Sequence, residues 1–205
     1  MSSLFLPREA SEVEQSFVRP PKGVQEFTGG CELSGQNAVR REKHFSELGG
    51  VYKQPEGLKE HDPNGIAYWV VNQNYHRQDF VMGNLQWGTT YINPFTVRGE
   101  CAMTHGHYHI DPNCDEYYYG LSGSGFLLFW DGGDDFYAEQ VFPGSLHYIS
   151  GRYAHRIINS GDSVLAVAAC SLPATKQDHA RIEREPFPWR CFKRDGEIVW
   201  EKEGA

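Results

Sequence analysis

Three residues in the stretch from Met103 to Gly125 have the types and the spacing of a metal site. His107 and His109 lie two positions apart, and side chains at that spacing on an extended strand point to the same side. Neutral imidazole is the commonest metal ligand, and Glu116 on the following stretch can supply a carboxylate. The sequence DPN between them favours a chain reversal. These residues therefore predict a bound divalent ion.

The elements that must position these residues resemble short strands. Runs rich in β-branched and aromatic residues begin at Ile66, and turn sequences such as DGGDD, PG and SGD separate them. Aromatic residues make up 14% of the chain and Gly numbers 22, which suits strands joined by tight turns. Strands at this spacing, with no helix between them, predict an all-β barrel or sandwich. A chain of 205 residues needs no second domain.

The two ends of the chain differ from this strand-rich part. Residues 1–63 are polar and broken by Pro, which predicts a partly irregular N-terminal arm packing on the barrel. Within the arm we expect a helix over Ala38–Leu48 and a short strand over 50–54. The barrel would then occupy residues 64–172.

Residues 173–205 are expected to form a C-terminal extension of the same structural domain. Arg194-Asp195-Gly196 lies between two strand-like runs and indicates a hairpin. We expect three apolar residues of this extension to be exposed and to cover a sheet edge or a second subunit: Phe192, Ile198 and Trp200.

The charge and the cysteine count limit the classes of partner and compartment. A net charge of −8 argues against nucleic acid and against an anionic membrane as partners. The five Cys are odd in number and have no close pair spacing, which favours reduced thiols and a cytoplasmic location. The first residues lack the basic start of a signal peptide, and no apolar run is long enough to span a membrane.

A fourth metal ligand would have to come from another part of the chain. His155 is preferred because it begins a strand-like run after a glycine turn. Spacing alone leaves two rivals open, His105 and His147, although we expect His147 to point out of the barrel and His105 to line the pocket mouth. Arg156 should face away from His155 and serve packing or a salt bridge.

Longer stretches around these residues resemble a known family. MTHGHYH, EYYYGLSGSGFLL and YAHRIINSGDSVLAVAAC are similar to the corresponding text of the cupin-type glucose-6-phosphate isomerases, over about Trp87 to Cys170. The resemblance implies a cupin double-stranded β-helix, which is a jelly-roll barrel with a metal inside. It implies an enzyme of glycolysis and gluconeogenesis, a homodimer, that interconverts glucose 6-phosphate and fructose 6-phosphate.

The resemblance also assigns roles to single residues. The implied metal ligands are His107, His109, Glu116 and His155. The implied substrate contacts are Thr90 or its neighbour Thr89, Thr104, the backbone at Gly106, His179 and Tyr118. Glu116 would be the base that moves a proton between C1 and C2, with Tyr118 assisting. One divalent ion per subunit is expected, with Fe²⁺ preferred and Mn²⁺, Ni²⁺, Zn²⁺ or Co²⁺ as alternatives.

The sequence departs from the family pattern after Cys170. Ser171 or Cys170 stands where the family has a Tyr, and a second Tyr has no counterpart. His179 aligns only with a one-residue shift, and Lys176 nearby is expected to be solvated. Two other functions therefore stay open. One is another metal-dependent cupin enzyme, either a dioxygenase or an isomerase of a different sugar phosphate; the other is a non-catalytic sugar-binding cupin.

Overall fold

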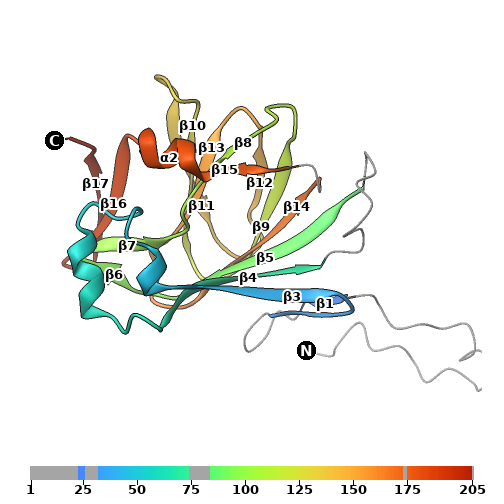
Figure 1. The fold of residues 1–205 in the computed structure, drawn as a ribbon, viewed down its shortest axis with the longest axis horizontal. Coiled ribbons are helices and arrows are strands. Elements are labelled where there is room, and N and C mark those ends of the chain that lie inside the picture. The colour runs from blue at the N-terminus through green and yellow to red at the C-terminus, as the bar shows by residue number, and fades with distance from the viewer. Residues whose placement is uncertain (1–22, 26–31, 74–83, 173–174, 205) are drawn as a thin grey trace, which may run out of the picture.

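The computed structural model describes residues 23–25, 32–73, 84–172 and 175–204 (Figure 1). Most of the elements are strands: β1 (Gly23–Gln25), β2 (Leu33–Gly35), β3 (Ala38–His44), β4 (Ile66–Gln73), β5 (Gln86–Ile92), β6 (Thr96–Val97), β7 (Glu100–Met103), β8 (Tyr108–His109), β9 (Glu116–Ser122), β10 (Gly125–Trp130), β11 (Phe136–Val141), β12 (Leu146–Ile149), β13 (Ala154–Asn159), β14 (Leu165–Ser171), β15 (Gln177–Asp178), β16 (Trp189–Arg194) and β17 (Glu197–Lys202). The helical elements are η1 (Phe45–Glu47), η2 (Pro55–Glu60) and α2 (His179–Arg184). None of these helices is both long and apolar enough to cross a membrane.

The strands form two large antiparallel sheets that face each other (Figure 1). The six-stranded sheet has the order β12-β9-β14-β5-β4-β3. The seven-stranded sheet has the order β11-β10-β13-β7-β16-β17, with β6 pairing to β7. Several neighbours are distant in the sequence, such as β9 and β14 in one sheet and β7 and β13 in the other, as in a jelly roll, where the chain crosses repeatedly from one sheet to the other. The predicted all-β cupin barrel is confirmed.

Alternating burial explains why these segments lie as strands of a two-layer barrel. β9 alternates between buried and exposed residues over its first five positions, and β12 does so over all four. The main core cluster contains side chains from both sheets, including Ile92 and Val167 from one and Leu127 and Phe129 from the other. Burial of this apolar surface between the sheets is the main force that holds them together.

The expected helix over Ala38–Leu48 is wrong. Residues 38–44 form β3, which pairs with β4 along its whole length, and only residues 45–47 make a short turn of 3₁₀-helix. The Arg, Glu and Lys of this stretch favour a helix locally, but pairing with the edge of a large sheet overrides that preference. The strand expected over 50–54 is also wrong, because these residues form turns and bends. The domain boundaries proposed at 63 and 172 stay a prediction.

The C-terminal hairpin is confirmed as β16 and β17. Asp195 and Gly196 both have positive φ, as a tight two-residue hairpin turn requires. The expected exposure of its apolar residues is wrong. Phe192 is 2% exposed, and Ile198 and Trp200 pack against the core, because β16 joins β7 of the seven-stranded sheet.

Candidate metal centre

The histidine pair and its expected partner come from segments that are hydrogen-bonded to each other. His107 and His155 face one another as an isolated antiparallel bridge, with backbone N to O distances of 3.2 and 3.0 Å. His109 ends β8, and Glu116 begins β9. The rings of His107 and His109 are stacked with centroids 5.5 Å apart, so they lie on the same side, as their spacing predicts.

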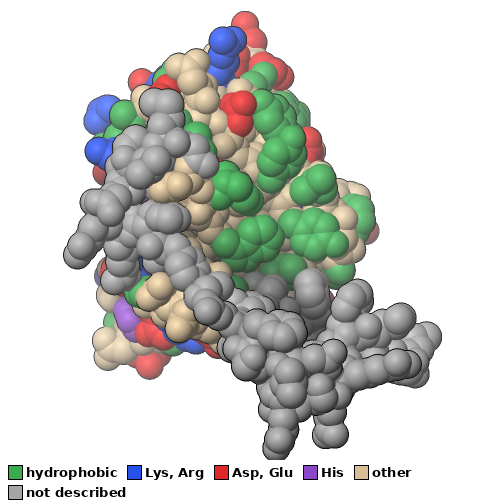
Figure 2. Space-filling view, turned by 90° about the vertical axis from the view of Figure 1, so that its right-hand side faces the viewer, with side chains coloured by type: hydrophobic (Ala, Val, Ile, Leu, Met, Phe, Trp, Pro, Cys, Tyr) green, Lys and Arg blue, Asp and Glu red, His purple; other side chains and the backbone are tan. Residues whose placement is uncertain are grey.

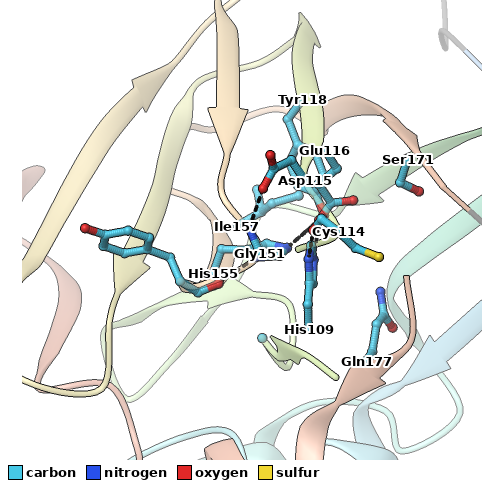
Figure 3. A network of polar contacts seen from close by, with 12 residues as sticks. His109, Cys114, Asp115, Glu116, Tyr118, Gly151, His155, Ile157, Ser171 and Gln177 are labelled. Atoms are coloured by element: carbon cyan, nitrogen blue, oxygen red, sulfur yellow. Dashed lines mark hydrogen bonds and ion pairs between the residues drawn. The ribbon is translucent and has the colours of Figure 1, made fainter. Parts of the chain in front are cut away.

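The four predicted ligand side chains converge on one buried point. One ligand atom from each of His107, His109, Glu116 and His155 lies within 4.8 Å of the others, and all four residues are buried. His109 Nε2 is 3.0 Å and His155 Nε2 is 2.9 Å from the same carboxylate oxygen, Oε1 of Glu116. Figure 3 shows both imidazoles turned toward this carboxylate. The structure therefore brings together the residues that sequence reasoning selected.

The donor chemistry of this group fits a divalent cation. His109 Nδ1 lies 2.6 Å from the carbonyl oxygen of Cys114, so this nitrogen carries a proton. Without a metal, Nε2 donates to Glu116, and loss of that proton would free its lone pair for an ion. His107 Nε2 is buried and has no hydrogen-bond partner among the described residues. Burying such a nitrogen without a partner is unfavourable, and so is crowding three buried imidazoles around one carboxylate when two of them must be protonated to bind it. A bound divalent ion removes both penalties.

Burial and mutual contact shift the pKa values of these groups in opposite directions. Burial, with the neighbouring His155, lowers the pKa of His107 well below its ordinary value. Burial also opposes the charged form of His109, but the hydrogen bond and charge of Glu116 outweigh it and raise the pKa of His109. Burial disfavours the ionised form of Glu116, yet hydrogen bonds from His109 and His155 prevail and lower its pKa. The carboxylate is therefore ionised at neutral pH.

The two rival histidines lie outside this cluster. His105 lines the cavity mouth as expected, where its Nε2 lies 3.4 Å from Oε1 of Glu183. The expected outward orientation of His147 is wrong. His147 is 3% exposed and pairs directly across from Tyr118, so its ring faces the barrel interior, where Glu139 and Ser145 bind it. Neither ring is among the four converging ligands.

A cavity of about 550 Å³ is lined by three of the four ligands, His107, Glu116 and His155. The predicted substrate contacts that line it are Thr90, Thr104, Gly106, Tyr118 and His179. Thr89 is not among the lining residues, because it alternates with Thr90 on β5 and pairs with Val71 and Ala168 on the opposite face of the sheet. Of the two threonines that the sequence left open, Thr90 is therefore the one that lines the cavity.

Tyr118 lies between the ligands and the cavity. Its hydroxyl oxygen is 3.3 Å from His155 Nε2. Burial, followed by the nearby charge of Glu116, raises the pKa of Tyr118 well above its ordinary value. The hydroxyl therefore stays protonated and can donate a hydrogen bond into the cavity.

Sequence reasoning missed the wall that β3 and β4 contribute. Tyr68, Val70 and Asn72 line the cavity from alternate positions of β4, and Arg41 and Lys43 line it from β3. The alternation of IAYWVVN was the available signal for β4, since residues two apart share a face. No such signal existed for Arg41, because its segment favours a helix when considered alone.

The wall built from residues after Cys170 is polar. Ser171, Thr175, Lys176 and Gln177 line the cavity there together with His179, whose Nδ1 lies 2.8 Å from the carbonyl oxygen of Gly106. Lys176 is exposed, as expected, and it also lies at the cavity wall. Ser171 lines the cavity and Cys170 does not, while the choice between them as the counterpart of the family Tyr stays open.

The metal-site residues and the cavity lie within a stretch that matches a known family. The family model for glucose-6-phosphate isomerase matches residues 42–203, which include all four converging ligands. A variant of oxalate decarboxylase from Bacillus subtilis superposes with a TM-score of 0.43 at 18% identity, over 59% of this chain and 29% of that chain. This structural similarity is too weak to support the fold assignment, which rests on the strand order.

Curated relatives agree with the family model. Glucose-6-phosphate isomerase of Thermococcus litoralis is 27% identical over 88% of this chain and 94% of its own length. The enzyme of Pyrococcus furiosus is 26% identical over 88% and 94%, and that of Sinorhizobium medicae is 26% identical over 78% and 75%. With four-fifths of the chain inside the family model, the chain belongs to the glucose-6-phosphate isomerase family.

Proposed function

We propose that this protein is a metal-dependent isomerase that interconverts glucose 6-phosphate and fructose 6-phosphate. It would hold one divalent ion, Fe²⁺ by preference, with Mn²⁺, Ni²⁺, Zn²⁺ and Co²⁺ as alternatives. The observation that carries the proposal is the buried convergence of three imidazoles and one carboxylate at the floor of the cavity. Within a family of glucose-6-phosphate isomerases, that convergence favours a metal at the reacting centre.

Glu116 is the proposed base. Moving a carbonyl between C1 and C2 requires a group that takes a proton from one carbon and returns it to the other. Oε1 of Glu116 is occupied by His109 and His155, which leaves its second oxygen to carry the proton. When bound, a divalent ion would act as a Lewis acid that stabilises negative charge on the substrate oxygens. The protonated Tyr118 hydroxyl would donate a hydrogen bond to the sugar.

The phosphate would bind at the opposite end of the substrate, against Thr90, Thr104 and the backbone of Gly106. Threonine hydroxyls and a glycine N–H bind phosphate oxygens without adding charge to the surface. Gly106 has a φ of +78°, so its peptide adopts a conformation that few other residues reach. This set of donors explains how a protein with a net charge of −8 can take an anionic sugar.

A coupled assay of fructose 6-phosphate conversion to glucose 6-phosphate tests the proposal directly. Protein stripped with a chelator should lose turnover, and reloading with Fe²⁺ or Mn²⁺ should restore it. Turnover that is indifferent to the chelator, at proven metal loss, would contradict the metal dependence. Folded, metal-loaded protein that turns over no hexose phosphate would favour a cupin enzyme with another substrate.

The isomerisation has a rival route, in which hydride moves directly between C1 and C2. Proton transfer by Glu116 through a cis-enediol exposes the migrating hydrogen to solvent, whereas a hydride shift does not. Running the reaction in deuterated water and measuring deuterium at C2 of glucose 6-phosphate distinguishes them. Product with no solvent label at all would exclude the proton-transfer route.

We also propose a homodimer that uses the outer face of the six-stranded sheet. This outer patch consists of exposed side chains on neighbouring strands: Trp87, Tyr117, Tyr119, Leu146 and Tyr148. Figure 2 shows hydrophobic side chains gathered on one side of the molecule. These five side chains are uncharged, and the exposed carboxylate of Asp115 beside them accepts a hydrogen bond from the Tyr148 hydroxyl at 2.7 Å, so two copies of a strongly acidic protein can meet there with little charge between them.

Light scattering coupled to gel filtration tests the dimer. Tyr119→Asp and Leu146→Asp should each shift the protein to monomer, because a charge would be buried at the interface. Val199→Asp, at an exposed position of the C-terminal hairpin, is the matched control and should stay dimeric. Wild-type protein that is monomeric at micromolar concentration would contradict the proposal.

A cytoplasmic location stays part of the proposal. Cys101, Cys114, Cys170 and Cys191 are free, and free thiols are typical of a reducing compartment.

A further inference from the structure

Arg156 is a buried cation directly behind the cavity. It follows His155 on β13 with its side chain on the opposite face, as alternation predicts, and the residue is only 6% exposed. Its Nε and Nη2 both lie within hydrogen-bond distance of the carbonyl oxygen of His105, at 3.2 and 2.6 Å. Its Nη1 lies 3.3 Å from the sulfur of Met103.

No carboxylate of the described residues lies within ion-pair distance of this guanidinium, and the charges of Arg190 and Glu100, which act on it from farther away, oppose each other. Within the described ranges of the chain, Arg156 forms no ion pair at 4.0 Å or less, so the expected salt bridge is absent while the expected packing is present. The guanidinium lies over the ring of Phe187, with its carbon 4.8 Å from the ring centroid. A buried charge whose direct contacts are a carbonyl, a sulfur and a ring is costly.

Arg156 also packs closely against Gly106. A Cβ added at Gly106 would lie 3.1 Å from Nε of Arg156 and 3.0 Å from the ring of Phe187. Gly106 therefore packs directly against the guanidinium of Arg156 and the ring of Phe187. Any side chain at this position would have to push one of them away.

The peptide that Arg156 holds is anchored on its other side as well. The N–H of His105 donates to the hydroxyl of Tyr68 on β4, while its carbonyl accepts from Arg156. The preceding Thr104 is fixed to Ile157, with N to O at 3.0 Å one way and N to Oγ1 at 3.2 Å the other. Both neighbours of His105, Thr104 and Gly106, line the cavity.

We propose that Arg156 is a positioning residue for the phosphate group of the substrate. By holding the His105 carbonyl it fixes Thr104 and Gly106 in place, and its unpaired positive charge attracts the dianion from behind that peptide. The inference rests on the proposed function for the identity of the substrate. In this acidic protein, Arg156 would thus supply a positive charge that acts on the phosphate without contacting it.

Binding of inorganic phosphate and the KM for fructose 6-phosphate test this role in full-length, metal-loaded protein. Arg156→Met should weaken phosphate binding, measured by titration calorimetry, and raise KM, each by about tenfold, with kcat within about threefold. Arg156→Lys keeps the charge but loses the paired donors, so it should recover part of both quantities. Metal content is measured in every variant, and comparisons are made at equal metal content.

Arg190→Lys is the matched control. Arg190 is a partly buried cation that pairs with Glu100 at 2.8 Å, and it does not line the cavity. Its substitution should lower the melting temperature and leave phosphate binding and KM unchanged.

Three outcomes would overturn the inference. The first is unchanged phosphate affinity and KM in folded Arg156→Met. The second is loss of metal in step with loss of activity, which would place the effect at His155. The third is a wild-type protein that binds no inorganic phosphate. Phosphate binding that responds to Arg156 in a protein without isomerase turnover would instead sustain the inference and refute the proposed reaction.

Discussion

The two sides of the cavity are built by different kinds of structure. On the metal side, His155 lies on β13 and Glu116 begins β9, two strands of the large sheets, and a backbone bridge ties His107 to His155. His109 ends the two-residue strand β8, which pairs with β15 of the far side. On the far side, the lining after Cys170 comes from the end of β14, a two-residue strand and the first turn of α2. Long ladders determine side-chain positions closely, and they hold Glu116 and His155 directly and His107 through its bridge, whereas the two-residue β15 and the first turn of α2 have no such ladder. The reaction centre is thus placed on the more rigid wall, and sugar recognition on the more adaptable one.

The largest expected effect comes from removing a ligand on the rigid side. His107→Ala deletes the imidazole whose Nε2 has no partner among the described residues, so metal affinity should fall by more than the roughly 10–100-fold typical of residues that merely support ligands. Turnover should be lost with it. Metal content measured by mass spectrometry, and the coupled assay, check this.

The control for His107→Ala is His147→Ala, which removes a buried histidine that lies outside the ligand cluster. It should cost stability and leave metal content unchanged. Equal metal loss in both variants would contradict the assignment of His107 as a metal ligand and of His147 as a histidine outside the metal site.

The next largest effect concerns Glu116 as a base. Glu116→Gln keeps an oxygen near the histidines but removes the group that accepts the proton. Turnover should fall by about 10²–10⁴-fold, with KM much less affected. Tyr118→Phe, which removes only a hydrogen-bond donor, should lose far less. A Glu116→Gln enzyme with full activity at normal metal content would refute the assigned role.

Smaller effects are expected on the loop-borne side. His179→Ala removes a ring that binds the Gly106 carbonyl, and Lys176→Ala removes a cation at the cavity wall. Each should raise KM for fructose 6-phosphate by about three- to tenfold, the scale of a single hydrogen bond, with metal content and kcat nearly unchanged. Loss of metal in either variant would show that the two sides are not independent.

The smallest effect is on stability and its dependence on pH in metal-free protein. Folding holds His107 neutral with a lowered pKa, so the unfolded chain binds the extra proton below about pH 6.5. The stability contributed by His107 is present above that pH and is lost as the pH falls toward its folded pKa. His109, whose pKa is raised, contributes in the opposite sense, with stability present below about pH 6.5 and lost as the pH rises through its folded pKa.

Melting temperatures of chelator-treated wild type and His107→Asn between pH 5 and 8 separate these contributions. The wild type should lose more stability on acidification than the variant does, by a few degrees, since about 1 kcal/mol moves the melting temperature by roughly 2–4 °C in a domain of this size. Parallel curves would contradict the assignment to His107.

The rigid side is also the side that the sequence predicted best. His107, His109 and Glu116 are close in sequence, and the period of a strand alone places them together. The β3 wall could not be predicted in the same way, because the pairing of residues 38–44 with β4 is a long-range contact that local preference opposes. Likewise, the burial of Phe192 depends on docking of β16 beside β7, which no local pattern encodes.

The role of Arg156 was predictable from the sequence only in part. Alternation predicted which way it faces, but its partner, the carbonyl of His105, is a backbone atom that has no signature in the sequence. A contact of this kind can be found only from coordinates. The same holds for the choice of Thr90 over Thr89, which required the register of β5 against its neighbours.

The bridge between His107 and His155 has a further consequence for how the protein acquires its site. The two residues are separated by nearly a quarter of the chain, and their strands meet only when the two halves of the barrel come together. Contacts of such long sequence separation form slowly and late in folding, because a large loop must be closed first. A metal ion therefore finds its full set of ligands only in the last stage of folding. It then acts chiefly by slowing unfolding, and leaves the rate of folding almost unchanged.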